Sequence, residues 1–288
     1  MKHILILLAL VSCTQKPIEI GPIASEPAPV LVDNPTPEPV LIDKPEQSYT
    51  LKSAKDKLTS IATNSACAKT SFRDHGTPPQ GFIKGIALTY VRAVCNQNSS
   101  TVLAMSKALG DPAKDALAHY GLKSEYPRER LNSLFAMLVG SGARESSWRW
   151  CAGKDSGAEN TSSDTCEAGL YQTSFNSRTA SEELPKLFEK YKTDKSGCFA
   201  EEYKGKTTCN ADNMKNWGTG EGLTFQKISK ECPGFATEYA AITFRARKSH
   251  YGPILRKEAQ VFPACVSMFE QIRQAIEAEP AICSQLGF

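Results

Sequence analysis

Glu145 is the residue whose type and surroundings best suit proton chemistry in this sequence. It stands in the stretch SGARESSWRW (141–150), at the end of an apolar helical pattern and just before Trp148 and Trp150. Burial against apolar groups disfavours the charged form of a carboxyl and raises its pKa. A glutamic acid in such a setting holds its proton at neutral pH and can act as a general acid. The alternative is a solvated charge at a helix end.

A second segment, AGLYQTSFN (168–176), follows within a stretch rich in Gly, Ser, Thr and Asn. We expect a loop or a short β-hairpin from 151 to 180. This region also offers candidates for a second carboxylate, and each has the alternative of being a solvated loop charge. Asp164 is the first choice and Asp155 the second, and the others are Glu159 and Glu167. A hydrolase that inverts or retains configuration needs such a group, to activate water or to act as nucleophile.

The order of these two segments resembles a known pattern. ARESSWRW followed by AGLYQTSFN is similar to the Glu-Ser and Gly-Leu-Met-Gln motifs of the lytic transglycosylase and goose-type lysozyme superfamily. The resemblance implies a lysozyme-like helical fold, with Glu145 as catalytic acid and base and Ser146 supporting it. It also implies that a groove is lined by Gly169, Leu170, Tyr171 and Gln172, where Tyr171 stands in place of the usual methionine.

The same resemblance suggests further substrate-binding residues. Trp148 would stack on a sugar ring, and Ser174 stands where some goose-type lysozymes carry an aspartate. Family members often carry Ala-Tyr-Asn-Ala-Gly downstream, with a tyrosine that faces the glutamate. This chain lacks that string, and Tyr239 in ATEYAAITFRARKSHYGP is the candidate for that tyrosine, with a core position as its alternative. Arg245 and His250 of the same segment are expected to be structural or to lie at the groove rim.

The implied activity is cleavage of peptidoglycan at the MurNAc–GlcNAc β-1,4 bond, either by hydrolysis or with formation of an anhydro sugar. Within the superfamily, the chain looks most like a lysozyme-like group of predatory bacteria that prefers de-N-acetylated peptidoglycan. The acidic loop before Gly169 fits this preference, since it would attract a free ammonium group. A non-catalytic peptidoglycan-binding lipoprotein with the same fold is the alternative. A protein that binds another protein through its proline-rich arm is a weaker one.

The N-terminus predicts export. Residues 1–12 combine a short basic start with an apolar run and are interpreted as a signal peptide. The run ends in Leu-Val-Ser-Cys, which resembles a lipobox and makes Cys13 a candidate for lipid modification and membrane attachment. Residues 13–47 form a proline-rich tether, with eight prolines between Pro17 and Pro45. The protein is therefore expected in the periplasm, on the outer membrane as a lipoprotein, or secreted.

Apolar residues at helical spacing predict a mainly α domain from 48 to 288. The expected helices cover 48–70, 81–95, 101–110, 111–122, 127–147, 182–193, 234–253 and 257–279. Asp111 is the predicted N-cap of the fourth, with Pro112 in its first turn. A domain of this length is large enough to bury a single core.

Ten cysteines in an exported chain predict disulfides. Pairing of neighbours predicts Cys67–Cys95, Cys151–Cys166, Cys198–Cys209 and Cys265–Cys283, which leaves Cys232 over. With only four histidines and no Cys-x-x-Cys spacing, we expect neither a metal site nor a cofactor. A net charge of +3 argues against a nucleic-acid partner, so the expected partner is peptidoglycan, bound by a monomer.

Overall fold

Helices form almost all the regular structure of this protein. The computed structural model describes residues 46–154, 162–246 and 252–288. The predicted signal peptide, Cys13 and all but the last two residues of the predicted tether lie outside the described residues. The first helix begins at Glu46, two residues before the predicted domain start at 48. Residues Lys44–Phe288 form one compact unit.

The longer helices are α1 (Glu46–Asn64), α3 (Gln80–Cys95), α6 (Pro127–Ser146), α7 (Glu183–Thr193), α10 (Gly220–Glu231), α11 (Pro233–Ala246) and α13 (Pro263–Ala278). The shorter ones are α2 (Ala66–Lys69), α4 (Ser100–Ser106), α5 (Ala116–His119), α8 (Ala200–Lys204), α9 (Ala211–Met214), α12 (Gly252–Leu255) and α14 (Ala281–Gln285). Two 3-10 helices, η1 (Pro112–Lys114) and η2 (Phe175–Ala180), complete the set within the described residues. The prediction of a mainly α fold is confirmed.

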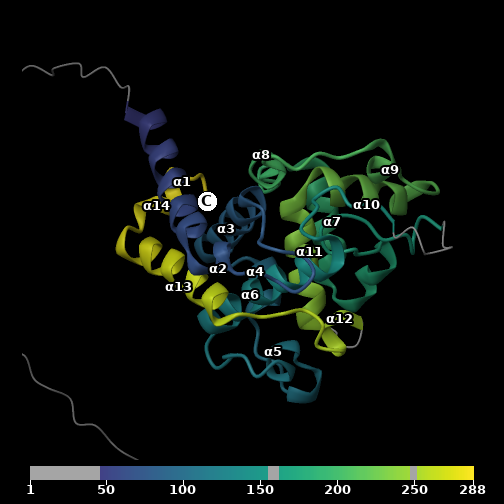
Figure 1. Cartoon of the computed structure of the whole chain (residues 1–288), viewed down its shortest axis with the longest axis horizontal. Coiled ribbons are helices and arrows are strands. Elements are labelled where there is room, and N and C mark those ends of the chain that lie inside the picture. The colour runs from purple at the N-terminus through teal and green to yellow at the C-terminus, as the bar shows by residue number, and fades with distance from the viewer. Residues whose placement is uncertain (1–45, 155–161, 247–251) are drawn as a thin grey trace, which may run out of the picture. The chain divides into compact units, whose positions relative to one another are not determined.

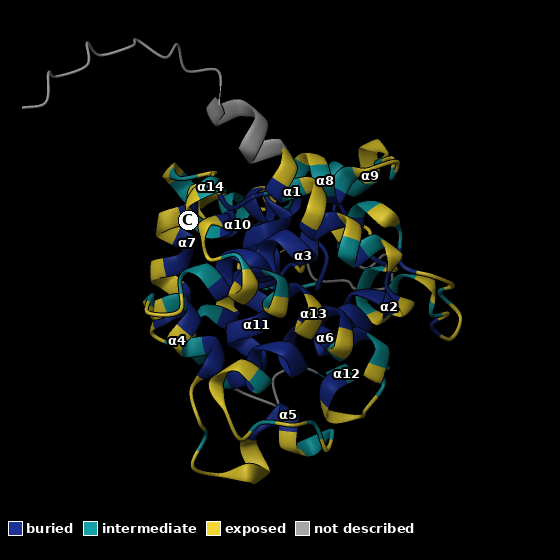
Figure 2. Cartoon of the chain, turned by 90° about the vertical axis from the view of Figure 1, so that its left-hand side faces the viewer, coloured by how far each residue is buried: buried dark blue, intermediate teal, exposed yellow. Residues whose placement is uncertain are grey.

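Three helices make the centre of the molecule. Figure 2 shows α3, α6 and α11 as mostly dark blue, and residues Pro233 to Arg245 of α11 are all buried. Such helices are apolar on most sides because neighbours cover them all round. Helices α1 and α13 pack on α3, α13 also packs on α6, and α7 and α10 pack on α11 (Figure 1).

The 3.6-residue period located six of the seven longer helices, missed α10, and misplaced some ends. The helix expected from 257 begins only at Pro263, whose fixed φ suits a first turn. Asp111 does cap a helix, since its Oδ1 accepts a hydrogen bond from the Ala113 N–H at 2.9 Å, but the capped element is the 3-10 helix η1. Helices α8, α9, α10 and α14 were not predicted.

The disulfide pairing differs from the prediction at every bond. The structure pairs Cys67 with Cys265, Cys95 with Cys283, Cys151 with Cys209, and Cys198 with Cys232. Neighbours in sequence did not pair, because helix packing brings the two ends of the domain together: α13 and α14 lie beside α1 and α3. Buried Cys166, rather than Cys232, lies outside these four bonds. Four disulfides indicate an oxidising compartment outside the cytoplasm.

The region from 151 to 180 is a loop that ends in η2. The predicted β-hairpin is not formed by its described residues, where the only pairing is an isolated bridge between Ala168 and Thr173. No described helix is both long enough and apolar enough to cross a membrane.

Candidate active site

Helix α6 carries Glu145 from the core to the protein surface. Residues Arg130 to Ala143 are all buried, and Glu145 in the final turn is partly exposed. Burial of this long middle section fixes the direction of the helix. The position of Glu145 therefore depends on the core and not on a mobile loop.

The chain leaves α6 through an unusual turn. Ser147 and Trp148 both have left-handed backbones, with φ of 50° and 59°. The Trp148 indole Nε1 donates a hydrogen bond to the Val139 carbonyl at 2.9 Å, which folds the ring back against the helix. His75 Nδ1 lies 2.9 Å from Ser147 Oγ and connects the segment before α3 to this turn. Left-handed conformations cost energy in residues other than glycine, so packing must impose this turn.

The first segment beside Glu145 is the loop Gly169–Gln172. Ser146 Oγ donates a hydrogen bond to the Leu170 carbonyl at 2.8 Å, which joins the last turn of α6 to this loop. Gly169 has a φ of +76°, a conformation that glycine adopts at little cost. Gln172 is also left-handed, at 46°, and its Nε2 donates to the Gly169 carbonyl at 3.0 Å. The loop is thus closed on itself beside the acid.

The second segment is the chain from Arg256 to Gln260. The backbone of Gln260 lies so close to α6 that a Cβ on Gly140 would collide with the Gln260 carbonyl oxygen. Arg144 Nε donates to Glu258 Oε2 at 3.1 Å, and Arg256 also pairs with Glu258. Glu145 therefore lies on a helix end that is held between two chain segments.

Burial raises the pKa of Glu145 from its usual 4.5 to about 8, and the negative charge of Glu167 is the second cause. Arg144 acts in the opposite direction, followed by smaller contributions from Glu258, which raises this pKa, and Arg256, which lowers it. Hydrogen bonds from Arg256 are the main reason why the pKa of Glu258 falls to about 2. At neutral pH, Glu145 is protonated while Glu258 is ionised, so the two carboxyl groups suit different roles.

The structure brings part of the predicted site together. Ser146 joins Glu145 to the loop that holds Gln172, and the side chains of Gln172 and Ser174 are partly exposed. Trp148 is 2% exposed, and Tyr171 and Tyr239 are 0% exposed. Their rings belong to the core beneath the protein surface. These three side chains are therefore too buried to contact a ligand directly.

Tyr239 lies near the predicted groove but faces the core. Its hydroxyl lies 3.0 Å from Ser177 Oγ, within hydrogen-bond distance, and the Ser177 hydroxyl lies 2.5 Å from the Ser174 carbonyl oxygen, which can only accept. The tyrosine thus lies beneath the segment that follows Gln172. Its ring packs against Phe225, with centroids 4.9 Å apart, in the aromatic core. This is the core position that the sequence left open as the alternative. Arg245, also buried, pairs with Asp115 and is structural, as expected.

The carboxylate that most affects the pKa of Glu145 is not Asp164, the first choice on sequence for a second catalytic carboxylate. Asp155 and Glu159 lie outside the described residues, as does His250. Asp164 is exposed and its carbonyl accepts a hydrogen bond from the Asn176 N–H at 2.8 Å, but its charge is not among those that act on Glu145. Glu167, three residues later, is the carboxylate whose charge raises the pKa of Glu145 most.

Arg256, Glu258 and His75 were not predicted at the site. Arg256 and Glu258 come from a segment more than a hundred residues beyond Glu145, and His75 from one seventy residues before it. No local pattern marks them, because their positions depend on how the segment before α13 and the segment before α3 pack against the end of α6. The close approach at Gly140 is the nearest thing to a signal, but a glycine inside a helical pattern does not by itself reveal which segment crosses there.

Comparisons with known proteins leave the site to be interpreted from its own geometry. No family model, curated protein or solved structure matches this chain. The described residues contain no group of three or more His, Cys, Asp or Glu side chains that could hold a metal ion. What the geometry offers is a proton donor at neutral pH, a nearby carboxylate, and a pair of arginines held by a third acidic residue.

Proposed function

We propose that this protein is a glycosidase that cleaves peptidoglycan at the MurNAc–GlcNAc β-1,4 bond. The observation that carries the proposal is Glu145, a partly buried acid at the end of a long helix whose pKa of about 8 keeps it protonated at neutral pH. Breaking a bond between two sugars needs such a donor, because the leaving oxygen must receive a proton as the bond breaks. The motif resemblance around Glu145 and Gln172 points to the same chemistry.

In the proposed first step, the Glu145 carboxyl gives its proton to the glycosidic oxygen while the bond from the anomeric carbon to that oxygen breaks. In the second step, the Glu145 carboxylate takes back a proton from the incoming nucleophile. Water as nucleophile yields a free reducing end, and the 6-hydroxyl of the same sugar yields an anhydro ring. The charge of Glu167 beside the acid favours hydrolysis, since a second carboxylate can activate water.

Backbone strain around the acid supports an active site at this place. The described residues include six non-glycine residues with left-handed backbones. Four of them lie in the segments around Glu145, namely Ser147, Trp148, Gln172 and Lys257. Such conformations cost on the order of 1–3 kcal/mol each and gather where a fold must hold side chains in fixed positions for chemistry.

The proposal extends to substrate and location. The exposed charge of Glu167 near the acid would attract the free ammonium of a de-N-acetylated glucosamine, so we propose a preference for de-N-acetylated glycan. Faster release of products from de-N-acetylated than from acetylated sacculi is the expected result.

We further propose lipid attachment at Cys13. A Cys13→Ser variant should then leave the membrane fraction, whereas equal membrane retention of both proteins would contradict the attachment.

The test of the activity compares exported, oxidised protein on purified cell walls. Wild type and Glu231→Gln, a matched change of an exposed residue on α10, should release soluble products equally. Glu145→Gln should lose activity by a factor of about 10²–10⁴, because the proton donor is gone. Mass spectrometry of the products then distinguishes reducing ends from anhydro ends. Equal activity of wild type and Glu145→Gln would overturn the proposal. Wall binding without cleavage by wild type would favour a glycan-binding protein.

A further inference from the structure

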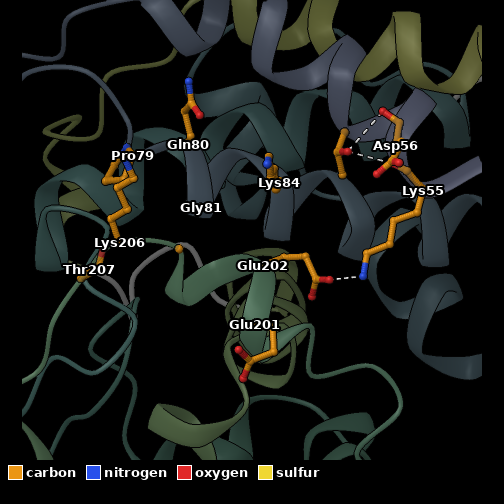
Figure 3. A pocket seen from close by; sticks show the side chains of 12 residues that line it. Lys55, Asp56, Pro79, Gln80, Gly81, Lys84, Glu201, Glu202, Lys206 and Thr207 are labelled. Atoms are coloured by element: carbon orange, nitrogen blue, oxygen red, sulfur yellow. Dashed lines mark hydrogen bonds and ion pairs between the residues drawn. The ribbon is translucent and has the colours of Figure 1, made fainter. Parts of the chain in front are cut away.

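One pocket of this protein lies apart from the candidate active site. A pocket of about 800 Å³ lies between α1, α3 and α8, and Figure 3 shows it from close by. This volume lies within the range of about 300–1,000 Å³ that is usual for sites that enclose small ligands. None of its described lining residues is Glu145 or a residue of the Gly169–Gln172 loop.

The floor of this pocket is rigid. A Cβ on Gly81 would come within 2.9 Å of both the Glu202 carbonyl oxygen and the Gly205 Cα, so the backbones of α3 and α8 already touch. One turn later, Gly85 leaves room for the buried ring of Tyr203. Because the two helices cannot move closer, the pocket cannot close by their collapse and is present before any ligand arrives.

The charged side chains that line the pocket are three lysines and three acids, and two of the lysines and one acid form no ion pair with a described residue. Lys55 pairs with Glu202, and Lys204 pairs with Glu201 at 3.3 Å, which neutralises both glutamates. Lys84 and Lys206 form no ion pair with any described residue. Figure 3 shows Lys84 on α3 and Lys206 just after α8, both on the pocket wall. Helix α3 also begins at this wall without a side-chain cap, so its first N–H groups add a positive partial charge there.

The pocket and the candidate active site are joined through the segment that follows α6. The Lys204 ammonium lies 5.4 Å from the centre of the Trp150 indole, and the disulfide Cys151–Cys209 links the same two segments. Trp150 is five positions after Glu145, a span of at most about 17 Å. Helix α8, which supplies Glu201 and Glu202 to the pocket, thus also contacts the segment that follows the helix of Glu145.

We infer that this pocket binds the peptide stems of the wall polymer, whose carboxylates are held by Lys84 and Lys206. The inference rests on the proposed function for its choice of polymer. Among the described lining residues there is no aromatic ring, so the apolar face of a sugar has nothing to stack on, and a peptide fits better. Asp56, exposed at the same pocket and without an ion pair to a described residue, suits the free amino group that such stems carry.

The test measures binding of a synthetic stem tetrapeptide to the full oxidised protein by calorimetry. Glu145→Gln serves as the background protein, so that no cleavage interferes. The double variant Lys84→Gln/Lys206→Gln should weaken binding at least tenfold, since each carboxylate loses a charge-assisted hydrogen bond. Lys227→Gln, which removes an exposed lysine of α10 far from this pocket in the chain, should leave binding unchanged. A tetrapeptide with amidated carboxylates should bind as weakly to the background protein as the free tetrapeptide binds to the double variant.

Cleavage assays separate this inference from the proposed function. The double variant should show a several-fold higher KM on sacculi that carry peptides and an unchanged rate on peptide-free glycan strands. Equal binding of the free tetrapeptide to the double variant and to Lys227→Gln, or no binding to the background protein, would overturn the inference even if wild type cleaves the wall. Binding that depends on both lysines would sustain a peptide site even if wild type cleaves no glycan. Inorganic phosphate that binds more tightly than the tetrapeptide would overturn the assignment to a peptide.

Discussion

Replacement of Glu145 by glutamine should make the protein more stable at alkaline pH, while leaving its stability unchanged at pH 4. In the folded protein, burial raises the pKa of Glu145 to about 8, whereas in the unfolded chain it returns to about 4.5. Below pH 4.5 the residue is protonated in both states. Between the two values only the folded state keeps the proton, so stability falls as the pH rises. Above pH 8, Glu145 is ionised in both states, so the full free-energy cost of burying its charge lowers the stability of wild type. Glutamine never ionises and avoids this cost.

The magnitude follows from the interval between these pKa values. At about 1.36 kcal/mol per pH unit, the upper limit of the gain is on the order of 5 kcal/mol. Glu145 keeps partial contact with water, which reduces the penalty on its charged form, so we expect about 2 kcal/mol at pH 9. For a domain of this size, that gain raises the melting temperature by about 4–8 °C.

Calorimetric melting of wild type, Glu145→Gln and Glu231→Gln between pH 4 and pH 9 tests this prediction, with the disulfides kept oxidised. Groups remote from Glu145 titrate equally in wild type and Glu145→Gln, so they cancel in the difference of melting temperatures. That difference should be near zero at pH 4, grow between pH 5 and pH 8, and then level off. The difference for Glu231→Gln, an exposed residue, should stay flat. Parallel curves for wild type and Glu145→Gln would refute the claim that the fold holds this acid protonated.

Three further predictions concern the neighbours of the acid. Ser146→Ala loses the 2.8 Å hydrogen bond to the Gly169–Gln172 loop and should cost about 1 kcal/mol in a denaturant melt, with a lower rate of wall cleavage. Gly140→Ala pushes against the Gln260 backbone and should cost about 1–3 kcal/mol, whereas Gly110→Ala, which meets no atom within 4 Å, should be nearly neutral in the same melt. Glu167→Gln removes a charge that raises the pKa of Glu145, so the alkaline limb of the pH–rate profile should move to lower pH. An unmoved limb would contradict the electrostatic effect of Glu167 on Glu145.

The four disulfides make the stability of this protein depend on the compartment in which it folds. Two of them, Cys67–Cys265 and Cys95–Cys283, join positions nearly two hundred residues apart, with separations of 198 and 188. Closing such long loops removes much of the freedom of the unfolded chain, which is the main way in which a disulfide stabilises a fold. Both bonds attach the C-terminal helices to the first helices of the domain, so the fold is expected to depend on export to an oxidising environment.

Local features of the sequence were sufficient for the helical fold. The apolar spacing of residues such as Leu131, Leu134 and Leu138 located α6, and that of Ile83, Ile86 and Tyr90 located α3. This works because a helix repeats every 3.6 residues and must place one stripe against the core, a demand that a short window of sequence already shows. The short helices α8 and α9 escaped prediction, since four or five residues are too few to show a period.

The sequence by itself also selected Glu145 and placed it at the end of a helix. Only the tertiary structure decided which groups surround it: Glu167 rather than Asp164, and the Arg256–Glu258 pair from a segment beyond α11. The same holds for the disulfides, none of which joins the partners that spacing suggested. The physical reason is common to both. Helix formation depends on residues three or four positions apart, whereas the environment of an acid or a thiol depends on which distant segments pack against it, and no local pattern records that.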